Sequence, residues 1–217
     1  MDAEPIRRFQ TLRWPLSLFI LLLGLSAWAW VVKPDFLFGA SEHPEQQRFA
    51  QPAGKPVALT DAFTSFEAEA AVVTRLQGAE LAYERSRTRR PVSAEYPPRD
   101  LTTLTVPEYR HLGVEGELRL LFFNDRLFEV HFVPREVERY AEGLARTYPG
   151  LDRDPNGRAE WVQGSLRIAS NVELARSAVG RTLDTQPYVL WQDLSLVRLR
   201  DEWDARFGAL PTPILED

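Results

Sequence analysis

The longest hydrophobic stretch of the chain runs from Trp14 to Val32, nineteen residues without a charge. At a rise of about 1.5 Å per residue, a helix of this length measures roughly 28 Å, close to the hydrocarbon thickness of a bilayer. Tryptophans lie near both ends, at Trp14, Trp28 and Trp30, and Lys33 follows directly. Indole rings favour the headgroup boundary, and a lysine there can extend its ammonium group to water. The pattern predicts one transmembrane helix over residues 14–32, with these four side chains at its membrane interfaces.

Basic residues close to a span tend to remain on the cytoplasmic side. Arg7, Arg8 and Arg13 precede the run, whereas Lys33 is the only basic residue in the fifteen residues after it. We therefore expect residues 1–13 to be a cytoplasmic tail, the span to lie in the inner membrane of a bacterial envelope, and the rest to be periplasmic. A cleaved signal peptide is the alternative, because small residues at the A-x-A spacing would permit cleavage after Ala29 and release a secreted binding domain.

Residues 33–58 differ in character, since Pro, Gly, Gln, Glu and Ala dominate and periodicity is weak. Such a segment has too little apolar surface to offset the entropy lost on ordering. We expect a flexible tether over 33–58, followed by a single domain of ordinary size over residues 59–217.

The clearest hairpin pattern lies between Gly116 and Pro134. Apolar residues alternate with polar ones on both arms, at Leu118, Leu120, Phe122, Phe128, Val130 and Phe132. Alternate residues of a strand share a face, so these six are predicted to share one buried face. A three-residue connection over 124–126 would pair Phe122 with Phe128 and Leu120 with Val130, whereas a two-residue turn would bring Glu129 and His131 to that face.

Helical periodicity marks three further segments. The first predicted helix begins near Thr60 or Asp61 and ends at Gly78, and a strand over 71–76 is the alternative. The second covers 137–148 and is expected to pack on the hairpin. The third ends the domain, and its inward-facing residues are Leu196, Leu199, Trp203 and Phe207. Extended segments are expected at 79–89, 160–169 and 187–191, and a short strand at 101–106 within a long loop over 91–107. The prediction is an α+β domain, a largely antiparallel sheet with helices on one face.

Composition removes several classes of function. The chain has 26 basic and 31 acidic residues, and without those of residues 1–33 the count is 22 against 29, about −7. Broad nucleic-acid binding is disfavoured by this acidity. The absence of cysteine excludes disulfides, thiolate metal sites and a cysteine nucleophile. We find no phosphate-binding glycine loop, nucleophile elbow or H-E-x-x-H helix, and we predict no cofactor.

Arg85, Arg87 and Arg89 alternate along one of the extended segments. On a strand they would form a positive stripe on one face, suited to anions or to an acidic patch of a partner. The alternative is that charged side chains protect an edge strand from aggregation. The stripe is the predicted contact surface.

A second pattern is Asp152-Arg-Asp154-Pro-Asn156-Gly157, which resembles the start of a calcium-binding loop, although Gln163 stands where the bidentate glutamate belongs. Pro155 disfavours the helical region for Asp154, and Asp-Pro-Asn-Gly is by itself a favoured turn sequence. Asp152, Asp154 and Asn156 are therefore weak metal candidates, and an ordinary turn is favoured.

The sequence thus predicts an accessory or scaffold subunit that is anchored in the bilayer and binds other membrane or envelope proteins. An anchored envelope hydrolase is the alternative from another class, and it would need two carboxylates converging in a pocket. The sequence itself favours no enzyme.

Overall fold

The structure, a computed structural model, describes residues 44–90 and 96–209. The segment predicted to span the membrane, with Trp14, Trp28, Trp30 and Lys33, lies outside these ranges. Among the described residues, no helix combines the length and apolar character needed to cross a membrane. The described residues from Glu45 onward belong to one compact unit.

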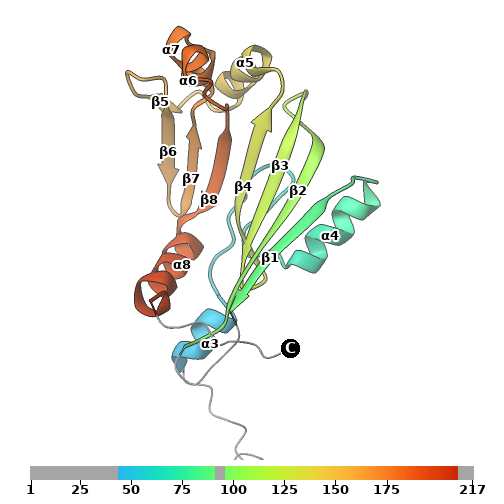
Figure 1. The fold of residues 1–217 in the computed structure, drawn as a ribbon, viewed down its shortest axis with the longest axis vertical. Helices are drawn as coiled ribbons and strands as arrows, with labels where there is room; N and C mark the ends of the chain where they lie inside the picture. Colours follow the sequence, from blue (N-terminus) through green and yellow to red (C-terminus); the bar gives the residue numbers. More distant parts are fainter. Residues whose placement is uncertain (1–43, 91–95, 210–217) are drawn as a thin grey trace, which may run out of the picture. The chain divides into compact units, whose positions relative to one another are not determined.

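One antiparallel sheet of eight strands organises this unit, in the order β1-β2-β3-β4-β8-β7-β6-β5 (Figure 1). The strands are β1 (Glu84–Arg90), β2 (Arg99–His111), β3 (Val114–Phe123), β4 (Arg126–Pro134), β5 (Asp152–Arg153), β6 (Ala159–Gln163), β7 (Leu166–Ser170) and β8 (Val189–Asp193). The helices are α3 (Pro44–Ala50), α4 (Glu69–Gly78), α5 (Val137–Thr147), α6 (Val172–Arg176), α7 (Ala178–Thr182) and α8 (Leu194–Phe207). The predicted α+β class with an antiparallel sheet is confirmed.

Two hydrophobic cores lie on opposite faces of the sheet. The first joins buried residues of β2, β3, β4 and β8 to α4, α5 and the segment around Leu59 and Phe63. The second joins Phe123 and Phe128 to α3 and α8. Because successive strand residues point to opposite faces, Phe122 belongs to the first core and Phe123 to the second. The expectation that helices cover only one face is therefore wrong.

The central hairpin has a shorter turn than expected. Asn124 and Asp125, both with positive φ, form a two-residue connection, as in the mirror-image turns that match the twist of a hairpin. Phe122 pairs with Leu127, not with Phe128, whereas Leu120 pairs with Val130 as predicted. The register shift between these pairs leaves Phe128 as an extra residue, a β-bulge.

This bulge explains which side chains reach each core. It turns Phe128 to the second core and keeps Glu129 and His131 away from the first. Five of the six predicted residues share the first core, and Phe128 does not. The helix over 137–147 lies on that core as expected, with the Tyr140 ring 5.1 Å from the Phe132 ring.

Three predicted boundaries change at the N-terminal side. The expected tether includes α3, whose Phe49 has no exposed surface, so the packed unit begins at Glu45 and not at residue 59. The helix ending at Gly78 starts only at Glu69, because the segment before it is held by backbone hydrogen bonds such as Phe66 N to Leu127 O at 2.9 Å. Instead of a short strand in a loop, β2 has 13 residues, nine of which pair with β3.

Candidate functional site

The edge strand β1 is the most exposed regular element of the sheet. It pairs with β2 from Glu84↔Thr105 to Arg90↔Arg99, and in the described part of the chain no strand pairs with its outer side. All of its residues are exposed except Arg90, which is partly buried. Its outer backbone donors and acceptors are thus available for a further strand.

The structure places Arg85, Arg87 and Arg89 on one face of β1, the face that carries α4. Arg85 forms an ion pair of 2.6 Å with Glu69 of α4. Arg87 bonds to Asp100 of β2, and this hydrogen bond raises the pKa of the guanidinium. Arg89 forms no ion pair with any described residue. An open groove of about 440 Å³ follows this face between α4 and β1. Ion pairs within the domain therefore engage Arg85 and Arg87, and Arg89 can form an ion pair with a partner.

The turn after α5 is organised by Asp154. Its Oδ1 accepts hydrogen bonds from the backbone N–H groups of Asn156 and Arg158, both at 2.9 Å. Gly157 has a φ of +77°, which glycine adopts without strain. Asp152 begins β5 and pairs with Glu160 in the sheet. Among the described residues, no three His, Asp or Glu side chains are grouped closely enough to hold a metal ion. The contacts that the structure gives Asp154 are those of a turn.

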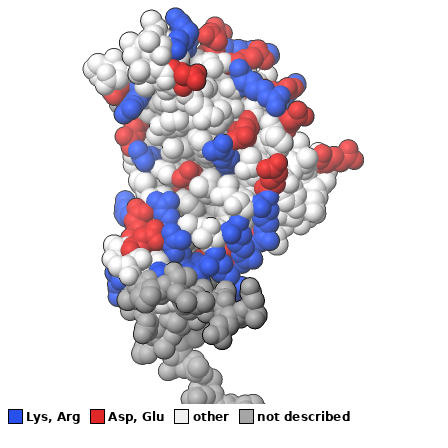
Figure 2. Space-filling model, viewed as in Figure 1, with Lys and Arg blue, Asp and Glu red and all other residues white. Residues whose placement is uncertain are grey.

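A chain of polar side chains crosses the open face of the sheet, which carries interspersed acidic and basic residues (Figure 2). Gln192 donates to the Glu129 carboxylate at 2.5 Å, and Arg167 donates to Gln192 at 3.0 Å and to Glu160 at 2.7 Å. Burial raises the pKa of Glu129, partly opposed by the Gln192 hydrogen bond. The amide and the guanidinium thus link Glu129 to Glu160, so the two carboxylates do not form the converging pair that a hydrolase would use.

His131 lies beside Glu129 on the same strand face. Its ring centroid is 5.5 Å from that of Tyr188, and the neighbouring Arg119 pairs with Glu117 at 2.6 Å. Burial, followed by the charge of Arg119, lowers the pKa of His131. The imidazole therefore resists protonation and is held among structural contacts.

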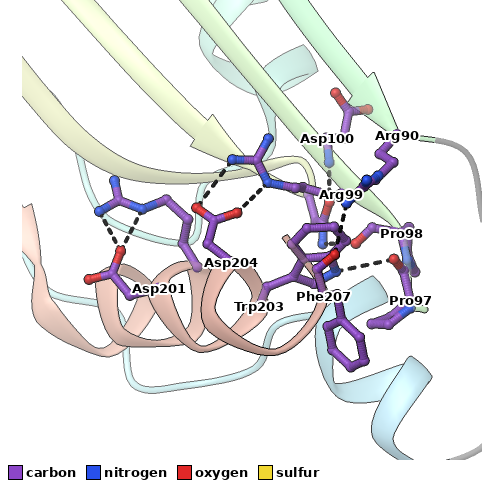
Figure 3. Close-up of polar contacts among 11 residues, drawn as sticks. Arg90, Pro97, Pro98, Arg99, Asp100, Asp201, Trp203, Asp204 and Phe207 are labelled. Atoms are coloured by element: carbon purple, nitrogen blue, oxygen red, sulfur yellow. Dashed lines mark hydrogen bonds and ion pairs between the residues drawn. The ribbon is translucent and has the colours of Figure 1, made fainter. Parts of the chain in front are cut away.

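A second concentration of arginine lies where α3 and α8 meet the ends of β1 and β2 (Figure 3). Trp203 is buried, with the guanidinium carbons of Arg90 and Arg99 each 5.4 Å from its ring centroid. Arg90 donates to the carbonyl of Phe207 at 2.9 Å, and Arg99 pairs with Asp204 at 2.7 Å. These contacts fix the end of α8 against the sheet.

The same region extends to α3 through Glu202. This carboxylate pairs with Arg48 at 2.7 Å and with Arg206 at 3.4 Å, and these two arginines lower its pKa. We call this cluster the basic pole; its members are Arg48, Arg89, Arg90, Arg99, Arg206, Glu202 and Asp204. This cluster was not predicted from the sequence, because its arginines come from four separate segments and only the Arg89-Arg90 pair is a local signal.

The chain matches no protein-family model and no curated protein.

Proposed function

We propose that the protein is a single-span, membrane-anchored accessory or scaffold subunit that binds other proteins of an envelope complex through its extracytoplasmic domain. The hydrophobic run over residues 14–32 supports the anchor. The edge strand β1 supports protein binding, and it is the observation on which the proposal depends most.

Strand addition is the binding mode that fits β1. An extended segment of a partner would continue the sheet through main-chain hydrogen bonds, and side chains on alternate positions would add specificity. The strand β1 has seven residues, almost all of them exposed, and this is about the usual length of a strand. Arg89 offers a charge for an acidic side chain of the partner, and the groove beside α4 offers room for larger ones.

The first experiment is purification of the tagged full-length chain from native membranes in mild detergent, followed by identification of proteins that co-elute in constant ratio. Stoichiometric membrane partners are the expected result, and a chain that elutes alone would contradict the proposal. An intact mass that includes Met1–Ala29 supports the retained anchor, whereas its absence would establish the secreted alternative.

A pair of proline variants then tests the edge strand itself. Backbone N–H groups of an antiparallel edge strand alternate between its neighbour and the outside, so Ser86→Pro and Arg87→Pro remove one donor of each kind. The variant that loses an inward donor should lower the unfolding midpoint. Because Arg87→Pro also removes the Arg87–Asp100 ion pair, each proline variant is compared with an alanine variant at the same position. The variant that loses an outward donor should keep the midpoint of its alanine control and still lose the co-eluting partner; partner binding retained by this variant would exclude strand addition at β1.

A further inference from the structure

His111, the last residue of β2, is a titratable side chain buried against the first core. It is 8% exposed, and its ring makes T-shaped contacts with Phe132 of β4 and Trp191 of β8, at centroid distances of 5.5 and 5.2 Å. In contacts of this kind one ring presents its edge to the face of the other. The ring of Tyr140, from α5, lies 5.8 Å away. The imidazole therefore lies where α5 packs on the sheet (Figure 1).

A single hydrogen bond joins His111 to α5. Its Nδ1 lies 2.8 Å from the hydroxyl oxygen of Tyr140, and among the described residues neither side chain forms a second hydrogen bond. A neutral imidazole can accept the hydroxyl proton at Nδ1 and carry its own proton on Nε2. This arrangement satisfies the hydroxyl of Tyr140, which has no exposed surface. The contact thus assigns the Nε2-H tautomer to the neutral imidazole.

Protonation of His111 reverses the direction of this bond. Both ring nitrogens of a histidinium carry protons, so Nδ1 becomes a donor and the oxygen of Tyr140 must accept. The hydroxyl proton of Tyr140 then points to no acceptor among the described residues, at a position without exposed surface. A buried donor without a partner destabilises the packed arrangement, and so does a cation among aromatic rings.

Asp61 is the carboxylate that acts against this effect. It lies in the segment before α4, and it is exposed, so that water screens its charge. Burial lowers the pKa of His111, and the charge of Asp61 opposes this decrease. The contacts from β4 and β8 are the uncharged rings of Phe132 and Trp191. The other titratable groups near the imidazole, from β2 and α5, are Tyr109, Arg139, Tyr140 and Tyr148.

The position of α5 depends on these contacts more than on its ends. Its N-cap, Glu136, makes no side-chain capping bond. Next to His111, Leu112 packs against Gly143, where an added Cβ would lie 3.4 Å from that of Leu112. At the other end of the helix, Tyr148 accepts a hydrogen bond of 3.3 Å from the indole of Trp191. Among the described residues, these tyrosines make the side-chain hydrogen bonds that join α5 and its C-cap to the sheet.

We propose that His111 makes the packing of α5 sensitive to acid: the neutral imidazole holds α5 on the sheet through Tyr140, and protonation favours a form in which α5 has left the first core. This inference depends neither on the anchor nor on any protein partner. In the open form the imidazole reaches water and has its ordinary pKa of 6.5, whereas the pKa of the closed form is lower. The open form therefore binds more protons, and acid favours it. Between these two pKa values, the ratio of open to closed molecules should rise by up to about tenfold for each pH unit of acidification.

Hydrogen exchange followed by mass spectrometry measures this opening in the full-length chain in detergent micelles, from pH 5 to 8. Exchange in peptides of α5 is corrected for its intrinsic dependence on pH. It is then compared with exchange in α8, which packs on the second core and ends at the basic pole. The opening ratio of α5 relative to α8 is expected to rise as pH falls below 6.5. An opening ratio that does not change with pH would overturn the proposal.

Two histidine variants assign the effect to one imidazole. His111→Asn keeps a hydrogen-bonding atom close to the position of Nδ1 but does not titrate in this range, so the opening of α5 should become independent of pH. His131→Gln is the matched control, because His131 lies on the opposite face of the sheet and its burial also lowers its pKa. This control should retain the pH dependence. A dependence that survives His111→Asn, or that disappears in His131→Gln, would overturn the proposal.

A magnetic resonance titration tests the same imidazole without a substitution at position 111, and it decides the matter if His111→Asn does not fold. The chain has three histidines, so His43→Gln together with His131→Gln leaves His111 alone. Its imidazole, labelled with carbon-13, should titrate with a pKa below 6.5 in the folded chain, because burial disfavours the charged form. A pKa at or above 6.5 would overturn the proposal, and the absence of a protein partner would count only against the function proposed above.

Discussion

Asn124 shows how a single side chain fixes the end of the sheet. Its Nδ2 donates to the carbonyls of Phe49 at 2.7 Å and Pro98 at 2.9 Å, and its Oδ1 accepts from the N–H of Asp100 at 2.7 Å. Its φ of +46° is a conformation that asparagine tolerates better than most residues. One amide therefore joins the hairpin turn to α3, to the segment before β2 and to β2 itself.

Replacing Asn124 with Asp tests this arrangement. The carboxylate has no donors for the two carbonyls and faces them with a negative charge in a buried position, so we expect the free energy of unfolding to fall by about 2–4 kcal/mol. Urea unfolding is the measurement. Asp125→Asn is the control, because asparagine also tolerates positive φ and can still accept the hydrogen bond from Glu69 N; a smaller loss in Asn124→Asp than in this control would contradict the role of the amide.

At the scale of elements, the hydrophobic pattern predicted the strands and helices whose apolar residues recur at a regular spacing. Period-two alternation predicted the Leu120–Val130 pairing, and helical spacing predicted the helices now seen as α5 and α8. The bulge at Phe128 was not predictable, because an extra residue changes the register without changing the alternation up to that point. Phe49 has no periodic apolar neighbours, so α3 appeared to belong to a tether.

The candidate site was predictable to the same limited extent. Strand spacing correctly placed Arg85, Arg87 and Arg89 on one face, but their partners Glu69 and Asp100 lie on other elements. The stack of Arg90 and Arg99 on Trp203 joins residues more than a hundred positions apart. Contacts of this kind depend on the tertiary fold, and no local pattern encodes them.

Truncation of Phe49 tests whether α3 is part of the folded domain. Phe49→Ala removes a fully buried ring that contacts Phe207, and we expect a loss of about 3–5 kcal/mol in the free energy of unfolding. Leu183→Ala is the control, because Leu183 is 69% exposed and should change stability by less than about 0.5 kcal/mol. Equal effects of the two variants on the free energy of unfolding would show that α3 belongs to the tether and not to the folded domain.

At the scale of the whole molecule, the sheet has a helix-covered core on one face and an open face that α3 and α8 cover only at one end. Titratable groups on that open face are partly desolvated by the sheet on one side and hydrated on the other. Burial raises the pKa of Glu129 and lowers that of His131, two residues apart on β4. The two groups therefore link folding to pH in opposite directions.

For Glu129 the folded state holds its proton more tightly than the unfolded chain, so its contribution to stability decreases as pH rises above its ordinary pKa of 4.5. For His131 the unfolded chain takes up a proton that the folded state resists, so stability is lost as pH falls below 6.5. The stability of Glu129→Gln relative to the natural chain should thus increase with rising pH above 4.5, whereas that of His131→Gln should increase with falling pH below 6.5. Urea unfolding from pH 4 to 8 measures both differences. A stability difference that does not change with pH in either variant would contradict the desolvation of these two side chains on the open face.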